Sequence, residues 1–321
     1  CISDRSRGGS RPGLVAVVAL VALLAALAGL PAEGADQRRT TGDEPHYLVT
    51  ALAIAAGDGL DVRHQYEHET YRPFHAAALE PQGAPRGDGR LVEPHDPLLP
   101  AVLAGPTALG GWMAAKAVMA LFAAGVAALT LVLAVRLGAS PSPAAAVVAT
   151  FAASVPLAPY GAQIFPEVPA ALAVLAAVLA ATGPLGRRGM IVAGIAIVAL
   201  PWLAVKYVPV AGVLAAIALW RCARAGRRRT AAGAGAALAL AGILFVLCAF
   251  LFLRRLTGSL VEPLNAGALL VVGLTTGVAA SLLRLPWVLV DDDDGHRFAW
   301  RPWLFVPCLT VALLATSISL P

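Results

Sequence analysis

The sequence is poor in charged residues. Only 13% of its 321 residues are Asp, Glu, Lys or Arg, whereas 59% are hydrophobic. Soluble domains carry about 25% charged residues, so half of that charge together with a mean hydropathy of +0.76 is typical of a membrane protein. This composition excludes a cytosolic enzyme and a disordered chain. It also excludes a nucleic-acid-binding protein, because the arginines form short clusters between apolar runs and no basic face.

Lysine and cysteine are also scarce. Lys116 and Lys206 are the only lysines, and the four cysteines are scattered without a CxxC pair. None of the cysteines lies in the long polar segment 31–97. The sequence therefore indicates neither a disulfide framework nor a zinc site, and it predicts no metal-ligand set.

Long apolar runs fill most of the chain. Because a helix needs about 20 apolar residues to cross a bilayer, these runs predict an all-α, polytopic transmembrane bundle of about eight to nine spans. The predicted spans are 14–30, 112–135, 144–158, 168–182, two short helices within 189–220, 232–253, 266–283 and 303–320. Residues 98–110 are apolar but too short to span, and we expect a re-entrant or interfacial helix there.

The beginning and end of the chain have their own interpretation. The first run could be a signal peptide, but its length favours an uncleaved helix. The chain begins with Cys1, and its last apolar run stops at Pro321, so we expect a fragment of a longer protein. Within it, residues 1–321 are predicted to form a single membrane domain.

The arginines indicate the orientation. Positive residues gather on the cytoplasmic connections of a membrane protein. One set of connections carries Arg5, Arg7, Arg11, Arg136, Arg187, Arg188, Arg221, Arg224, Arg227, Arg228 and Arg229. The opposite short connections carry Lys206, Arg254 and Arg255, which places the 31–97 loop outside the cytoplasm. The side of the acidic run 291–294 stays open, because 266–283 could cross or re-enter.

Polar chemistry is concentrated in the 31–97 loop, which holds five of the six histidines and 12 of the 19 acidic residues. Such a loop is either a site at the membrane boundary or simply a solvated connection. Its sharpest pattern places Asp43 and Glu44 just before Pro45, at the predicted start of a short helix. A carboxylate held there can act as a general base on a hydroxyl. The alternative is that Asp43 only caps the helix.

Glu167 is the only acidic residue between residues 97 and 261. It begins a predicted span on the outer side, where an ionisable group is either functional or an interfacial cap. Lys116 and Lys206 map to the same side. Their ammonium groups could hold a lipid-linked phosphate, or they could extend to lipid headgroups.

Three further features of the loop have weaker patterns. His95 and Asp96 directly precede residues 98–110 and could orient a phosphate or a metal, or form an Asp-Pro turn. Arg72 is a second phosphate candidate. The histidines at 64 and 68 have helical metal-ligand spacing, but without an HExxH motif we expect them to be solvated.

In this order, these residues resemble the GT-C superfamily, membrane glycosyltransferases that use polyprenyl-phosphate-linked sugars. The pattern is nearest to the protein O-mannosyltransferase-like and aminoarabinose transferase-like families. It runs from residue 14 to about 210 and includes 42–47, 95–100, 163–167 and 201–207. The resemblance implies a GT-C-like bundle with a large first extracytoplasmic loop.

The resemblance also implies roles. Asp43 would deprotonate the acceptor, Glu44 would assist it or bind a metal, and Glu167 would occupy the second acidic position. The aminoarabinose transferases have a lysine where this chain has residues 93–96. Donor-phosphate binding would therefore fall to Lys206, Arg72, His95 or Lys116. Substrate contacts would come from His46, Tyr47, Asp96, Tyr160, Gln163 and Tyr207.

The implied enzyme moves a sugar from a polyprenyl-phosphate donor to a hydroxyl of a glycan, lipid or protein, outside the bacterial plasma membrane. One base without a covalent nucleophile predicts inversion. No organic cofactor is expected, although a divalent cation could assist the leaving phosphate. The alternatives are a transporter or flippase, and a non-catalytic scaffold. A hydrolase is disfavoured, because no GxSxG, HExxH or Cys/His set is present.

Overall fold

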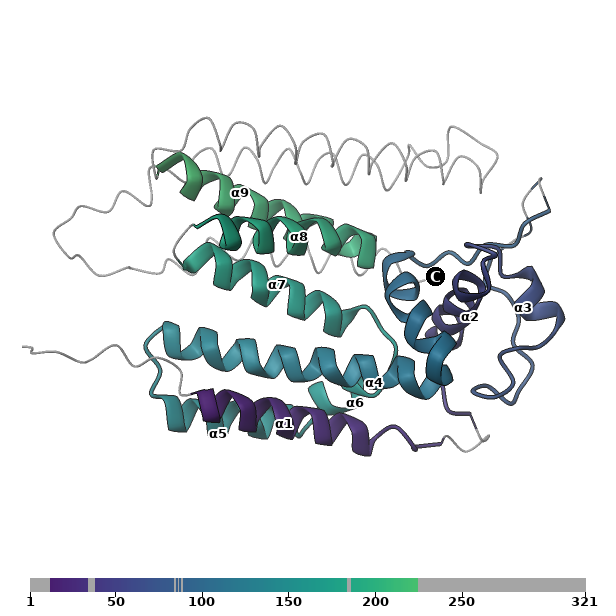
Figure 1. The fold of residues 1–321 in the computed structure, drawn as a ribbon, viewed down its shortest axis with the longest axis horizontal. Coiled ribbons are helices and arrows are strands. Elements are labelled where there is room, and N and C mark those ends of the chain that lie inside the picture. The colour runs from purple at the N-terminus through teal and green to yellow at the C-terminus, as the bar shows by residue number, and fades with distance from the viewer. Residues whose placement is uncertain are drawn as a thin grey trace, which may run out of the picture. The chain divides into compact units, whose positions relative to one another are not determined.

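The computed structural model describes residues 12–33, 38–83, 85, 87, 89–183 and 186–224 (Figure 1). All of them belong to the first of two compact units, Cys1–Val278 and Ala279–Pro321. The described residues form helices and no β-strand, which confirms the all-α prediction. The expected spans 232–253, 266–283 and 303–320, and the acidic run 291–294, lie outside the described residues.

Apolar helices packed side by side make up most of the described structure. They are α1 (Pro12–Ala28), α4 (Leu98–Arg136), α5 (Pro141–Ala152), α6 (Leu157–Gly161), α7 (Glu167–Thr182), α8 (Arg187–Leu203) and α9 (Val208–Arg224). In chain order, α1 packs on α4, α4 on α7, α7 on α8, and α8 on α9 (Figure 1). The two helices of the polar segment, α2 and α3, are described below.

Helix α4 has a bend where the sequence has two consecutive glycines. Gly110 and Gly111 have non-helical backbone angles, and Gly111 has a φ of 64°, a conformation that favours glycine because a Cβ atom would clash there. The bend separates residues 98–109 from 112–136, as the expected short helix and span predict. Among the helices that the structure describes, α4 alone is long and apolar enough to cross a membrane by itself.

One expected span is shorter than the sequence suggests. The run 144–158 forms α5, which ends at Ala152, and a separate short helix α6 begins at Leu157. Pro156 stands between them. Because a proline disfavours helical backbone at the residue before it, the helix ends ahead of this position. By contrast, the expected break within 189–220 lies where predicted, between α8 and α9, and Lys206 is in the short 3₁₀ turn η1 (Val205–Tyr207).

The polar segment folds into a layer at one end of these helices, where α2 (Glu44–Ala56) packs on α4 and on α3 (Arg63–Glu67) (Figure 1). The Val62 N–H donates to Leu91 O at 2.8 Å, and the Thr40 hydroxyl donates to Phe74 O at 3.1 Å. Val62, Phe74 and Leu91, which lie in these hydrogen-bonded segments, are buried. The described residues of 38–97 are therefore a folded layer, which we call the 38–97 layer, and its buried side chains belong to the same apolar core as those of the helices.

A buried ion pair joins this layer to the helices. Glu44 and Lys116 are only 1% and 4% exposed, and Lys116 Nζ lies 3.3 Å from Glu44 Oε1. The same oxygen accepts the Ile164 N–H at 2.8 Å, and the other accepts the Thr41 N–H at 2.8 Å. Lys116 also donates to Arg39 O at 2.6 Å. The Glu44–Lys116 pair thus connects the layer, α4 and the α6–α7 connection.

The outer faces of several helices expose large apolar side chains at helical spacing. More than a third of each of the following side chains is exposed: Val17, Leu20 and Leu24 of α1, Val147 and Phe151 of α5, and Ile191, Ile195 and Val198 of α8. In each helix these residues lie three or four positions apart and therefore share one face. Contiguous exposed apolar surface of this kind marks a face that contacts another apolar phase or protein.

We predict that Lys116→Met destabilises the protein by about 3–5 kcal/mol, because removing one partner leaves the carboxylate of Glu44 buried and uncompensated. Chemical unfolding of the purified full chain measures this change in the free energy of unfolding. The double variant Glu44→Gln/Lys116→Met removes both charges and is expected to regain most of the loss.

Arg72→Met serves as the matched control, since Arg72 and Glu69 form an exposed pair at 2.6 Å, and pairs of this kind contribute little. Equal stability of Lys116→Met and Arg72→Met would contradict the structural role of the buried pair.

Candidate functional site

The candidate site is built around the first turn of α2. Gly42 has a φ of 53°, and the Glu44 N–H donates to Thr41 O at 3.1 Å, so the chain turns sharply before the helix. Pro45 occupies an early helical position, where its missing N–H and fixed φ are well suited. Asp43 stands at the N-cap position but makes no side-chain cap hydrogen bond. Its carboxylate instead accepts a hydrogen bond from Gln82 Nε2 at 3.1 Å.

Tyr47, one turn into α2, is the centre around which the other groups gather. Its ring stacks on the ring of His95, with centroids 4.6 Å apart. Burial raises the pKa of the Tyr47 phenol, and the negative charges of Asp43, Glu167 and Asp96 raise it further. The three carboxylates are therefore close enough to act electrostatically on one hydroxyl, although they come from three distant parts of the sequence.

The turn η1 completes the site. Helix α8 ends at Leu203, Ala204 is extended, and η1 follows before α9 begins. The Val205 N–H donates to Asp96 Oδ2 at 3.1 Å. Lys206 Nζ donates to Oε1 of Glu167, the first residue of α7, at 2.6 Å. We name the group Asp43, Tyr47, His95, Asp96, Glu167, Lys206 and Tyr207 the Tyr47 site.

The electrostatics of the Tyr47 site are dominated by carboxylates. Asp43, Asp96 and Glu167 each carry a carboxylate. Among the described residues, Lys206 is the cation that donates a hydrogen bond to one of them, Glu167. Burial raises the pKa of Asp96, against a hydrogen bond from the Val205 amide. Burial lowers the pKa of His95, although Asp43 and Glu93 act in the opposite direction. His95 is therefore neutral near pH 7 and suits hydroxyl groups better than a phosphate.

A buried hydrogen-bond network of His46, Tyr66 and Glu93 adjoins the Tyr47 site. His46 Nδ1 lies 2.8 Å from the Tyr66 hydroxyl and 3.2 Å from Glu93 Oε1, and Tyr66 also donates to Glu93. Burial alone would raise the pKa of Glu93, but these hydrogen bonds outweigh it and lower the pKa. The other oxygen of Glu93 accepts the Gln82 N–H at 3.3 Å. Gln82 therefore connects this network to Asp43.

The position of Gln82 is fixed by its neighbour Gly83. A Cβ atom on Gly83 would lie 2.0 Å from Val92 O, so only glycine allows the two segments to cross here. Gln82, Tyr66 and Glu93 were not singled out from the sequence as site residues. Gln82 lies 39 residues from Asp43 in a stretch rich in proline and glycine, and no local pattern indicates the contact.

The remaining predicted residues fall into two groups. Tyr160 and Gln163 lie in and after α6. Burial raises the pKa of the Tyr207 phenol, and Glu167, Tyr47 and Tyr160 raise it further, so this connection borders the Tyr47 site. Four others do not join the site. Glu44 and Lys116, expected to act on the acceptor or on phosphate, neutralise each other in the interior. Arg72 is held by Glu69 and Ala76 O at the surface, and His46 belongs to the supporting network.

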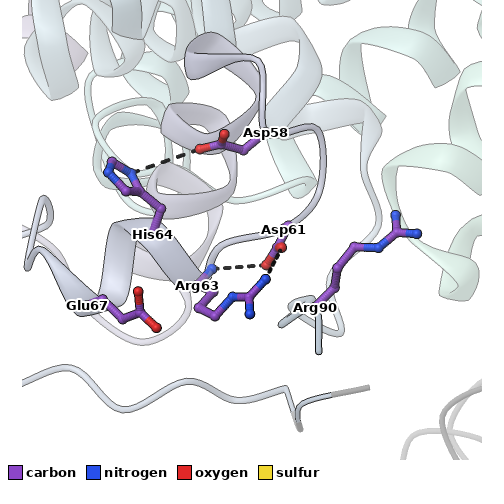
Figure 2. Close-up of a pocket in the computed structure, with 6 residues that line it drawn as sticks. All are labelled: Asp58, Asp61, Arg63, His64, Glu67 and Arg90. Atoms are coloured by element: carbon purple, nitrogen blue, oxygen red, sulfur yellow. Dashed lines mark hydrogen bonds and ion pairs between the residues drawn. The ribbon is translucent and has the colours of Figure 1, made fainter. Parts of the chain in front are cut away.

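A separate pocket of about 340 Å³ lies near the other end of α2 (Figure 2). Since α2 has 13 residues, that end is about 20 Å from Asp43. Arg63 pairs with Asp61 at 3.1 Å, and His64 Nδ1 lies 4.0 Å from Asp58. The pocket contains none of the predicted catalytic residues. Across the described part of the chain, no three His, Cys, Asp or Glu side chains are placed to hold a metal ion.

Comparisons with known proteins leave the function open. No protein-family model matches the sequence, and no curated protein and no solved structure is significantly similar to it. Function must therefore be inferred from the geometry and chemistry of the Tyr47 site.

We predict that acidification destabilises the protein as the pH falls from about 7.5 to 5.5. Burial lowers the pKa values of His95 and His75 below 6.5, so the unfolded chain binds protons that the folded chain does not. Stability is then complete above pH 6.5 and is lost below it, by at most about 1.4 kcal/mol per pH unit for each histidine.

Chemical unfolding at several pH values measures this slope, and His95→Gln and His75→Gln are each expected to reduce it. An unchanged slope in the double variant would show that the pH dependence has another origin.

Proposed function

We propose that this chain is a membrane glycosyltransferase that moves a sugar from a polyprenyl-phosphate donor to an acceptor hydroxyl. The observation that carries the proposal is that the carboxylates of Asp43 and Glu167 both act on the Tyr47 hydroxyl, while Lys206 donates a hydrogen bond to Glu167, at one end of an apolar helix row. The resemblance to GT-C enzymes gives these three residues roles in the reaction, beside Glu44, Arg72, His95 and Lys116. A base, a cation and a further carboxylate are what this transfer requires of a protein.

The proposed location is the outer boundary of a bacterial plasma membrane. Apolar stripes on α1, α5 and α8 face outward, as expected for helices that contact lipid tails. The 38–97 layer lies at one end of these helices (Figure 1), and η1 contacts this layer through the hydrogen bond from Val205 to Asp96. A polytopic, GT-C-like bundle of about eight to nine spans would place the Tyr47 site at the extracytoplasmic headgroup level, where a polyprenyl donor presents its phosphate.

Asp43 fits the part of the general base. Its carboxylate is half-buried, makes no helix-cap hydrogen bond and is oriented by Gln82. The acceptor oxygen bonds to C1 of the sugar while its proton passes to Asp43. The bond from C1 to the phosphate oxygen breaks, and polyprenyl phosphate leaves with the electron pair. A single displacement of this kind inverts the configuration at C1.

Lys206 fits the part of the phosphate ligand. Its side chain is 58% exposed, its Nζ approaches Glu167 from η1, and its ammonium group can stabilise the charge that develops on the leaving phosphate. Lys116 is buried against Glu44 and Arg72 is bound to Glu69. Of the four residues expected to bind phosphate, Lys206 is therefore the one we assign. A divalent cation could add charge at the same place, but the reaction as written does not depend on one.

We predict that Asp43→Asn lowers sugar transfer by about 10²- to 10⁴-fold, the usual contribution of a general base. Membranes containing the full chain would be supplied with radiolabelled polyprenyl-phosphate sugars, and transfer would be measured at equal expression. Asp58→Asn is the matched control, since Asp58 lies at the far end of α2 and binds Gln65. Wild-type transfer by Asp43→Asn would exclude Asp43 as the base.

Lys206→Met is expected to raise the KM for the donor by about 10- to 100-fold, because a charge-assisted hydrogen bond to phosphate is lost. Arg72→Met, which removes another exposed cation outside the Tyr47 site, should leave the KM unchanged. The measurement is a donor titration with each variant. A rise in KM for Arg72→Met but not for Lys206→Met would contradict the assignment of Lys206 as the phosphate ligand.

A further inference from the structure

Buried polar atoms without partners gather at the Tyr47 site. Four buried side-chain atoms of the described residues accept or donate no hydrogen bond, and three of them are His95 Nε2, Glu167 Oε2 and the Tyr207 hydroxyl oxygen. Leaving such an atom unpaired costs stability, so folded proteins rarely tolerate it without a reason. Three in one site indicate groups that are kept for a ligand.

The chemistry of these atoms suits hydroxyl groups. A neutral imidazole nitrogen can donate or accept, a carboxylate oxygen accepts, and a phenol does both. Hydroxyls, which also donate and accept, complement all three. The carboxylates of Asp43 and Asp96 beside them disfavour an anionic ligand. These atoms therefore suit a neutral polyhydroxylated molecule such as a sugar.

The turn η1 contains Tyr207 and is held by two contacts. Val205 N–H donates to Asp96 Oδ2 at 3.1 Å, and Lys206 Nζ donates to Glu167 Oε1 at 2.6 Å. Glu167 thus holds Lys206 with one oxygen while its other oxygen is buried and unpaired. The ion pair is 58% and 39% exposed on its two sides, so it is weak and another anion can replace Glu167 as the partner of Lys206.

We infer that donor and acceptor bind in a fixed order: the lipid-linked phosphate takes Lys206 from Glu167, the Val205–Asp96 contact opens so that η1 shifts together with Tyr207, and Glu167, His95 and the Tyr207 hydroxyl then bind the hydroxyls of a neutral sugar acceptor. The inference rests on the proposed function, since it takes Lys206 as the phosphate ligand. It goes further in naming the acceptor class and in making acceptor binding depend on the donor.

Hydrogen–deuterium exchange of the full chain in lipid nanodiscs tests the release of η1. The probe is undecaprenyl phosphate, which carries the phosphate but no sugar, and the measured region is 202–208. The Val205 amide is expected to exchange at least about tenfold faster once its contact with Asp96 is lost. Undecaprenol, which lacks the phosphate, and inorganic phosphate at the same concentration should leave exchange unchanged.

Unchanged or slower exchange at saturating undecaprenyl phosphate would overturn the inference, and acceleration by inorganic phosphate would overturn the lipid-linked source. Lys206→Gln should exchange rapidly without any ligand and should not respond to undecaprenyl phosphate, whereas Arg72→Gln should behave as wild type. None of these measurements involves sugar transfer, so a failure of the proposed enzymatic activity would be seen separately.

Tyr207→Phe tests the acceptor role. The variant removes one hydroxyl whose oxygen has no protein partner, so the fold should not change. In a transfer assay the KM for the acceptor should rise about 3- to 10-fold, with the KM for the donor unchanged. Equal values of both constants in the variant and in the wild type would remove Tyr207 from the acceptor site.

Discussion

The geometry of the site depends on the buried Glu44–Lys116 pair. Two opposite charges in the interior must remain together, since either one alone would be left without compensation. Glu44 is bound by Lys116, Thr41 and the Ile164 N–H, the last from 120 residues away. Asp43 directly precedes Glu44, and Glu167 follows Ile164 by three residues. The pair thus fixes the two carboxylates that the proposed reaction uses, without contacting a substrate.

Adjacent residues of the same type have different tasks because their surroundings differ. Glu44 is buried and bound on both oxygens, whereas Asp43 is half-buried and its carboxylate accepts a hydrogen bond from the amide of Gln82. The two lysines differ from each other in burial in the same way. Lys116 is enclosed by protein, and Lys206 stands in an exposed turn with a weak partner. Rigid contacts therefore position the Tyr47 site, and exchangeable contacts lie where ligands are proposed to bind.

Features that depend on neighbouring residues could be predicted from the sequence. The start of α2 at Asp43 and Pro45, the bend of α4 at Gly110 and Gly111, and the turn containing Lys206 follow from local backbone preferences. Contacts between distant segments could not be predicted. The sequence offers two lysines and many acids, but nothing in it states that Lys116 pairs with Glu44 while Lys206 pairs with Glu167, and Gln82 lies in a polar stretch without a pattern.

The central claim is that the Tyr47 site binds the phosphate and the sugar of a polyprenyl-linked donor. A cryo-electron microscopy structure of the full chain with such a donor tests it most directly. The account predicts the phosphate in hydrogen-bond contact with Lys206 Nζ, and C1 of the sugar facing the carboxylate of Asp43. A phosphate bound at the pocket of Arg63 and Arg90 instead, or a sugar turned away from Asp43, would contradict it.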